Sequence, residues 1–448
     1  MNKQIKDRPA DTGKSRTSWK KRLSGLSKRL GLLGLSTFIC LLLLEGALRV
    51  MIPTPGMPRE LYNQHDEILG WEKQPNRRNH IKAARYSTTQ IVNSEGFIGP
   101  EYPIEKMHDE YRILCLGDSY TEGYNVEFED IFSEVLKRSL DGLTPDRRVE
   151  VINTGVGGYS TDQEYLVFEH KAKKYCPDLT VLMFYHNDVW LNARPTGFGG
   201  ALKPYYKLTE DGQLELTNVP VPPVFLFGQT DGQHLSLSQR IVVRSKRWLS
   251  LNSRLYENVR QAVKQTPFLD NLVIRMGMGR KAADDTLLDT AAETGRTAVP
   301  DLYRVWEIDQ KPEVDYAWAV TRALLGKLKT ETSAIGSDFF VYYIPNREAI
   351  YPELWEKMRE KYDMKEDEWD IEKCGRDLSR ICDELGIAFF NSTEAYRAAA
   401  TSFSEVDERL YGELDAHWNE RGHYLAGEHL TENIYHSFLP GPHLSRTE

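Results

Sequence analysis

The chain has 448 residues, of which 27% are charged and 40% hydrophobic, and it contains 23 Tyr, 16 Phe and 9 Trp. This length excludes a small disulfide-stapled module, and the aromatic content excludes global disorder, because such a chain can bury a large core. The net charge is -9, yet residues 1–30 hold 10 Lys/Arg against 2 Asp/Glu, whereas the remainder holds 47 against 64. The acidic body argues against nucleic acid as a partner, and the basic head needs a separate explanation.

An apolar segment follows the basic head. No charged residue lies between Leu30 and Leu44, and the apolar run continues to Ile52. A helix over 30–52 spans roughly 30 Å of hydrocarbon, and the preceding cations favour a cytoplasmic N-terminus. We therefore predict a basic cytoplasmic tail over 1–29, a single-pass anchor in the inner (plasma) membrane over 30–52, and a periplasmic or otherwise extracytoplasmic body.

Two alternatives compete with an uncleaved anchor. A cleavable signal peptide requires small residues at two fixed positions after its apolar core. This chain has Glu45-Gly46-Ala47-Leu48-Arg49 there, which is a poor match. Glu45 and Arg49 are four residues apart, so they can pair on one helix face near the membrane boundary. A buried helix of a soluble domain fits poorly with ten flanking cations.

After the anchor, the sequence pattern changes at residue 111 and again at an insertion. Residues 53–110 begin with prolines and contain turn signals, which predicts a stalk and a collar of short strands. From residue 111 to the end, apolar strands alternate with helices, a pattern typical of a parallel sheet covered on both faces. An insertion at about 190–312 interrupts this alternation. The predicted strands are 111–116, 149–153, 179–185, 338–344 and 387–390. The predicted helices lie near 130–141, 161–174, 313–332, 351–362, 368–385 and 420–437. Within the insertion we predict a hairpin at 205–208 and 214–216 and amphipathic helices near 237–264.

A serine follows the first predicted strand of the sheet. Gly117-Asp118-Ser119 lies where open α/β sheets bind ligands. A hydroxyl there becomes a nucleophile once a base takes its proton. The simpler alternative is a strand-end turn in which Ser119 caps the next helix.

Two further loops can supply hydrogen-bond donors. The segment from Asn153 to Gly158 follows the second strand, and its glycines permit backbone shapes that present N–H groups to an anion. Asn187 follows the third strand, where its side-chain amide can donate to a developing oxyanion. Taken alone, the first is better explained as an ordinary loop, and the second as an Asx turn.

An acid and a histidine precede the last predicted helix, in the segment Asp415-Ala416-His417-Trp418-Asn419. An aspartate near a histidine can fix its tautomer and stabilise the imidazolium. The alternative is a helix start capped by Asn419, with a structural histidine beside it.

Together the four motifs resemble those of the SGNH/GDSL hydrolase superfamily, in the same order along the chain. The resemblance covers roughly 111–190 and 335–437, and the stretches Gly70-Trp71 and 93–97 are similar to a membrane-anchored bacterial subgroup. It implies a three-layer, flavodoxin-like α/β fold with a parallel sheet. It also implies site roles, carried over by position. Ser119 matches the nucleophile and an oxyanion donor, Gly158 and Asn187 the other two oxyanion donors, His417 the general base and Asp415 the triad acid.

The chain departs from the family pattern at two places. The acid usually stands three residues before the histidine, but Asp415 stands two before His417, so Glu413 remains a rival acid. Glycine usually precedes the asparagine, whereas this chain has Tyr185-His186. No histidine cluster has zinc-ligand spacing, and we expect neither a metal nor a cofactor.

The leading functional prediction is an extracytoplasmic serine esterase or deacylase that works through an acyl-enzyme, on ester-linked acyl groups including carbohydrate esters. The same apparatus could transfer the acyl group to a sugar of a cell-envelope or exported polysaccharide, which would make it an O-acyltransferase. A third alternative is a non-catalytic binding or assembly protein, because fold alone does not fix function. The expected partners are the ester substrate and, through 30–52, the membrane.

Overall fold

The computed structural model describes residues 14–51, 62–82, 86–222, 299–401, 409–412 and 416–439, and a few residues between 245 and 259. The chain divides into two compact units, Met1–Pro55 with Ile241–Val273, and Gly56–Arg240 with Ile274–Glu448. The amphipathic helices predicted near 237–264 fall largely outside the described residues. So do the two candidate acids, Asp415 and Glu413.

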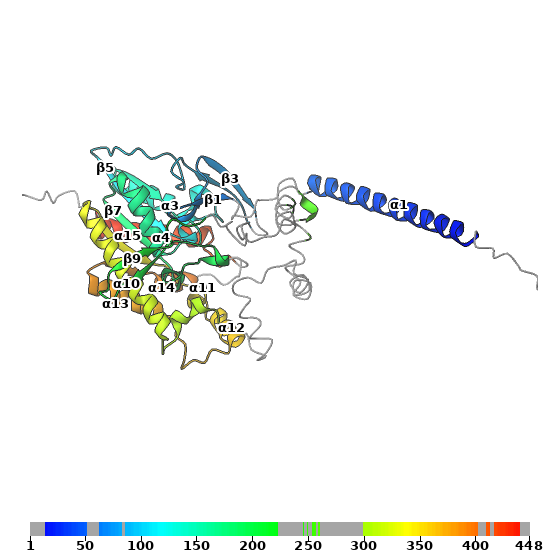
Figure 1. Ribbon diagram of the computed structural model, residues 1–448. Coiled ribbons are helices and arrows are strands. Elements are labelled where there is room, and N and C mark those ends of the chain that lie inside the picture. Colours follow the sequence, from blue (N-terminus) through cyan, green and yellow to red (C-terminus); the bar gives the residue numbers. More distant parts are fainter. Residues whose placement is uncertain are drawn as a thin grey trace, which may run out of the picture. The chain divides into compact units, whose positions relative to one another are not determined.

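In the first unit, helix α1 (Lys14–Met51) is the long blue helix of Figure 1. Its stretch Gly31–Val50 is 20 residues long, has a mean hydropathy of 2.0 and is 0% buried. The pair predicted from sequence forms, with Arg49 Nε 2.8 Å from Glu45 Oε1. Glu45 also accepts hydrogen bonds from Ser253, Arg254 and Leu255, so part of the insertion contacts this helix.

The second unit is built on a five-stranded parallel sheet in the order β11-β10-β7-β5-β6. Its strands are β5 (Glu110–Gly117), β6 (Arg148–Asn153), β7 (Leu179–Phe184), β10 (Asp338–Tyr343) and β11 (Ala388–Asn391). If these five strands are renumbered 1 to 5 along the chain and read from β6 to β11, their order is 2-1-3-4-5. This is the strand order of flavodoxin-like folds, so the predicted fold class is confirmed. Strands β5 and β7 are buried along their whole length because both faces of the sheet are covered.

Helices cover the sheet on both sides (Figure 1). One face packs against α3 (Phe132–Leu143), α14 (Thr393–Ala400) and α15 (Glu420–Ser437). The other packs against α4 (Thr161–Val167), α10 (Pro312–Ala334) and α13 (Lys373–Leu385). A hydrophobic core lies on each face of the sheet, and successive side chains of β5 point alternately into one core and the other. Ile113 and Cys115 belong to the first core, and Leu114 and Leu116 to the second. Further short helices include α5 (Asn187–Asn192), α11 (Arg347–Ile350) and α12 (Pro352–Tyr362).

The predicted collar consists of two antiparallel hairpins, as expected from its turn signals. Strand β1 (Asn63–Asp66) pairs with β2 (Gly70–Lys73), and β3 (Arg77–Lys82) pairs with β4 (Ser87–Val92). A bridge between Ile98 and Asn153 joins the segment after β4 to the end of β6. The collar therefore belongs to the same compact unit as the sheet.

The sequence predictions differ from the structure in several details. The helix predicted at 161–174 is α4 followed by a π turn at Phe168–Ala172 and a 3-10 turn at Lys173–Tyr175. Helix α14 was not predicted, although its alanine-rich sequence favours a helix. The helix predicted at 368–385 begins only at Lys373.

The hairpin of the insertion is confirmed as β8 (Tyr205–Leu208) and β9 (Leu214–Thr217). Cys176 is a free and exposed thiol.

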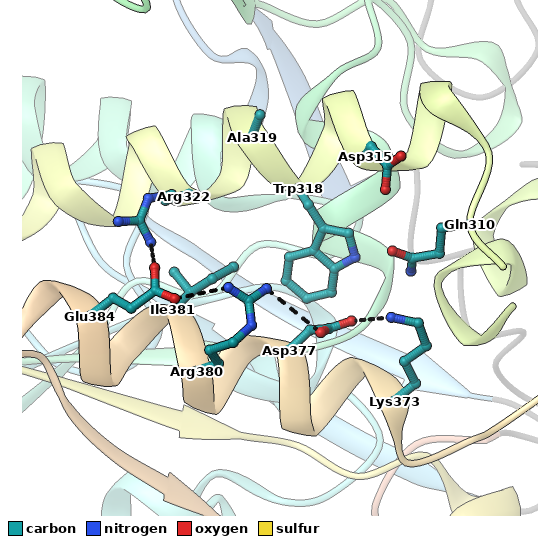
Figure 2. Close-up of a pocket in the computed structure, with 10 residues that line it drawn as sticks. All are labelled: Gln310, Asp315, Trp318, Ala319, Arg322, Lys373, Asp377, Arg380, Ile381 and Glu384. Atoms are coloured by element: carbon teal, nitrogen blue, oxygen red, sulfur yellow. Dashed lines mark hydrogen bonds and ion pairs between the residues drawn. The ribbon is translucent and has the colours of Figure 1, made fainter. Parts of the chain in front are cut away.

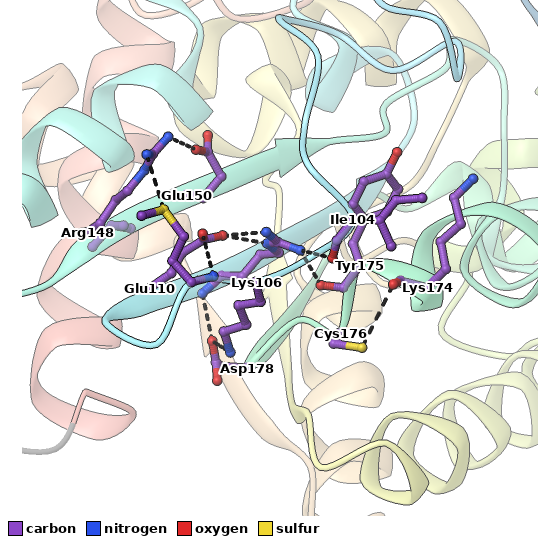
Figure 3. A network of polar contacts seen from close by, with 12 residues as sticks. Ile104, Lys106, Glu110, Arg148, Glu150, Lys174, Tyr175, Cys176 and Asp178 are labelled. Carbon is purple, nitrogen blue, oxygen red and sulfur yellow. Dashed lines mark hydrogen bonds and ion pairs between the residues drawn. The ribbon is translucent and has the colours of Figure 1, made fainter.

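A polar network closes the amino ends of the strands, at the opposite edge from the predicted site (Figure 3). The fully buried Arg112 guanidinium contacts Glu110 Oε1 at 2.6 Å and donates to the carbonyl of Tyr175. Lys106 pairs with Asp178, whose carboxylate also accepts from the Arg112 N–H. A buried charge is tolerated when it is paired and hydrogen-bonded in this way. We assign this network to the structure of the sheet edge.

Candidate active site

Ser119 stands at the start of a short helix directly after strand β5, which lies between β7 and β6. Helix α2 (Ser119–Glu122) is capped by Asp118, whose Oδ1 accepts the N–H of Tyr120 at 2.9 Å. The alternative in which Ser119 itself is the cap is therefore wrong. Ser119 is half-buried while its two neighbours are buried, so its hydroxyl faces the surface at the carboxyl edge of the sheet.

The structure brings Ser119 and His417 together across almost 300 residues of chain. Their Oγ and Nε2 atoms lie 2.7 Å apart. This is the distance at which a hydroxyl donates to a neutral imidazole nitrogen, and it is the geometry of a nucleophile with its base. His417 is also half-buried.

The segment that carries His417 is fastened to the segment after Ser119. The Tyr120 hydroxyl donates to the Ala416 carbonyl at 2.8 Å, and the Asn125 amide donates to the Trp418 carbonyl at 2.6 Å. The Tyr124 hydroxyl lies 3.1 Å from His417 Nδ1. If Nε2 accepts from Ser119, Nδ1 carries the ring proton and donates to the Tyr124 oxygen. Tyr124 was not predicted from the sequence, because the contact joins residues 293 positions apart.

The Gly-rich loop after β6 lies against the Ser119 turn. A Cβ atom at Gly155 would come within 2.3 Å of the Glu122 nitrogen, so only glycine permits this approach. Gly158 has φ of +82°, the left-handed region that favours glycine. Among the described residues, none accepts a hydrogen bond from the Gly158 N–H.

Asn187 begins helix α5, directly beyond the end of β7. Its Nδ2 lies 3.4 Å from Asp118 Oδ2, so one carboxylate links the turn after β5 to the turn after β7. Since the amide nitrogen carries two hydrogens, one remains for a second acceptor. Three of the four motifs thus follow the neighbouring strands β6, β5 and β7, and the fourth supplies His417, which contacts Ser119.

Two other predicted elements have clear positions. Asn419 caps helix α15, accepting the N–H groups of Arg421 and Gly422 at 3.1 Å each. His186 is buried against Tyr185 and Trp306, with ring centroids 4.2 and 4.7 Å away, and burial lowers its pKa to about 3. It is a neutral packed ring.

The triad acid is not among the described residues, so Asp415 and Glu413 both remain predictions. In the described part of the chain, no group of three His, Cys, Asp or Glu side chains is placed to hold a metal ion. A cavity of about 450 Å³ lies elsewhere, between α10 and α13 (Figure 2). It is lined by Trp318 and Ile381 and by ion pairs such as Arg322–Glu384, and it includes none of the candidate catalytic residues.

A model of the GDSL-like Lipase/Acylhydrolase family matches residues 115–318, which include Ser119, Gly158 and Asn187. The segment 115–318 is therefore similar to the GDSL-like lipase/acylhydrolase family. The resemblance predicted from the sequence motifs is confirmed, and the chain is an ester hydrolase. No curated protein matches it.

Several solved structures are similar to this hydrolase. The acetylxylan esterase Axe2 from Geobacillus stearothermophilus is 11% identical, with a TM-score of 0.36 over 75% of this chain and 100% of that one. The acetyl xylan esterase AlAXEase is 12% identical, with a TM-score of 0.34 over 72% and 99%. The enzyme LAE5, from the metagenome of Lake Arreo in Spain, is 12% identical, with a TM-score of 0.34 over 72% and 94%. The fold assignment itself rests on the strand order.

Proposed function

We propose that this hydrolase is a membrane-anchored, extracytoplasmic serine esterase or deacylase, with Ser119 as nucleophile, His417 as general base and Asp415 as triad acid. The observation that carries the proposal is the 2.7 Å contact between Ser119 Oγ and His417 Nε2 at the carboxyl edge of the sheet. An ordinary helix cap needs no such partner, whereas a serine nucleophile does.

In the proposed reaction, His417 takes the proton of Ser119 as the hydroxyl attacks the ester carbonyl. The carbonyl oxygen becomes an oxyanion that accepts from the N–H groups of Ser119 and Gly158 and from the Asn187 amide. The imidazolium then gives its proton to the leaving alcohol. Water, activated by the same histidine, attacks the acyl-enzyme and releases the acid and free Ser119.

The substrate class is proposed to include acyl esters of carbohydrates. Phe198 is 40% exposed and lies beside the oxyanion loop, where a Cβ atom on Gly158 would be 3.6 Å from its ring. An exposed aromatic ring next to the reacting atoms offers a face to an acyl chain or to a sugar ring. The similar structures named as acetylxylan esterases agree with this class.

The location is proposed from helix α1. Its apolar residues between Leu32 and Leu44 are largely exposed, Leu43 by 69%, as expected of side chains that face lipid. We propose that Gly31–Val50 anchors the chain, that the basic tail stays in the cytoplasm and that the hydrolase unit lies outside. A reporter fused after Glu448 should be active only outside the cytoplasm, and the purified protein should retain its N-terminus. Activity of a cytoplasm-only reporter would overturn this topology.

The activity is tested with the full-length protein in detergent micelles, supplied with acetyl esters with and without oligosaccharide acceptors. Release of acetate that does not depend on an acceptor supports the esterase. Acetate that appears on the sugar only when the acceptor is present would make the chain an acyltransferase. Absence of both reactions, together with tight binding of an acylated sugar, would favour the binding protein.

A further inference from the structure

Strand β2 of the collar contacts the peptide that supplies the proposed Gly158 donor. The Trp71 side chain is buried, and its indole N–H donates to the carbonyl oxygen of Gly157 at 3.2 Å. This carbonyl and the Gly158 N–H belong to one peptide unit. Because a trans peptide is planar, the two groups point in opposite directions, and fixing the carbonyl fixes the direction of the N–H.

The other side of Gly157 is held by a buried ion pair. Its N–H donates to Glu122 Oε2 at 2.7 Å, and Glu122 Oε1 contacts Lys73 Nζ at 2.5 Å. The Gln90 amide donates to the same oxygen at 2.9 Å. The side chains of Lys73 and Glu122 are both 0% exposed. The collar therefore holds Gly157 directly through Trp71 and indirectly through Lys73.

Trp71 itself has little freedom to move. The Tyr159 hydroxyl donates to its backbone carbonyl, and the two rings pack with centroids 5.6 Å apart. A Cβ atom at Gly197 would come within 2.9 Å of the indole, and one at Gly158 within 3.5 Å. The indole is enclosed by the loop that it supports, so its hydrogen bond has one available direction.

We propose that Trp71 is a positioning residue of the oxyanion hole, which aims and polarises the Gly158 N–H through the shared peptide, with the Lys73–Glu122 pair as a second support. A hydrogen bond to a carbonyl strengthens the donor at the other end of the same peptide. This inference rests on the proposed function. It makes the collar, which precedes the family match at 115–318, part of the catalytic apparatus.

The test is Trp71→Phe in the full-length protein, which keeps an aromatic ring and removes the indole N–H. We expect kcat on an acetyl ester to fall about 10-fold, the effect of one neutral hydrogen bond, with KM within twofold of wild type. Amide hydrogen exchange in the peptide covering 153–160 should become faster, while the strands of the sheet stay protected.

Trp318→Phe is the matched control. This indole also has a buried N–H, without a partner among the described residues, and it lines the cavity of Figure 2. The same chemical change there should leave kcat, KM and exchange at 153–160 unaltered. If Trp71→Phe does not fold, 3-benzothienylalanine at position 71 keeps the indole shape without its N–H and carries the same expectations.

Unchanged exchange and unchanged kcat in a folded Trp71 variant would overturn the inference. Faster exchange with unchanged kcat would also overturn it, because the loop would then be held without serving the oxyanion. A rise in KM alone would assign Trp71 to substrate binding. Failure of the proposed function is recognised separately, since ester turnover would then be the same in wild type and Ser119→Ala, whatever the exchange at 153–160.

Discussion

His417 has two nitrogens with different tasks, and the neighbours of each decide what it can do. Nε2 faces Ser119, whereas Nδ1 lies 3.1 Å from the Tyr124 hydroxyl. A phenol can orient the ring, but it brings no negative charge to stabilise the imidazolium. A carboxylate does both, which is why the account still requires Asp415.

Variants at the three candidate partners of His417 rank their roles. Asp415→Asn should lower kcat by up to about 10⁴-fold, by analogy with the serine-protease triad. Tyr124→Phe should lower it by less than about 10-fold, the loss of one neutral hydrogen bond. Glu413→Gln should have the smallest effect. Circular dichroism checks that each variant is folded. A larger loss for Glu413→Gln than for Asp415→Asn would mean that the acid was assigned wrongly.

Asn187→Ala removes one proposed oxyanion donor and leaves the acceptor Asp118 in place. We expect kcat to fall by about 10²–10³, the usual loss for one side-chain donor. KM should change little, because the charge on the oxygen develops only in the transition state. Steady-state kinetics separate the two parameters. A change confined to KM would place Asn187 in substrate recognition.

The candidate site residues that follow strands could be proposed from the sequence, whereas the residues that contact them could not. Ser119, Gly158 and Asn187 were candidates because the carboxyl ends of parallel strands meet at one edge. Tyr124 and Trp71 could not, since their contacts join segments 86 or more residues apart and leave no local pattern. The cap at Asp118 was missed because the pattern Asp-Ser leaves both residues as candidates.

At the scale of elements, helix α4 shows how the insertion is tied to the sheet. Lys203, from the start of the insertion, forms a fully buried ion pair with Asp162 in the first turn of α4. Burial raises the pKa of Asp162 and lowers that of Lys203, so each charge depends on the other. Strand positions were predictable from apolar runs, but this pairing was not, because nothing local distinguishes Lys203 from an exposed lysine.

Lys203→Met should destabilise the protein by about 3–5 kcal/mol, because it leaves the Asp162 carboxylate buried without a counter-charge. The double variant Lys203→Met/Asp162→Asn should recover much of this loss. Urea unfolding of the three proteins measures both effects. A double variant as unstable as the single one would mean that lost packing, not the unpaired charge, causes the destabilisation.

At the scale of the whole molecule, some of the many carboxyl groups of this acidic chain are buried inside the hydrolase unit. Burial, together with the negative charges of Asp188 and Asp118, raises the pKa of Glu164 well above its usual range. In the unfolded chain the same group ionises near its ordinary value. Between these two values the native state binds more protons, so the contribution of Glu164 to stability falls as the pH rises.

Glu164→Gln removes this titration. The free energy of unfolding of the variant minus that of the wild type should therefore increase as the pH rises from 5 to 8. Urea unfolding at both values measures it, and groups that titrate in both proteins cancel. Glu366→Gln, at a side chain that is 90% exposed, is the control and should show no such trend. A difference that shrinks as the pH rises would contradict the assignment.

The central claim, that Ser119 is the nucleophile of an ester hydrolase, is tested most directly by ester turnover of Ser119→Ala in the full-length protein. The account predicts that turnover is abolished while the thermal unfolding profile stays close to that of wild type. The hydroxyl is half-buried at the start of α2, so its removal costs about one hydrogen bond, roughly 0.5–1.5 kcal/mol. His417→Ala should be nearly as inactive, and the double variant little worse, because the two residues act as one unit. A folded Ser119→Ala protein that keeps wild-type turnover would contradict the mechanism.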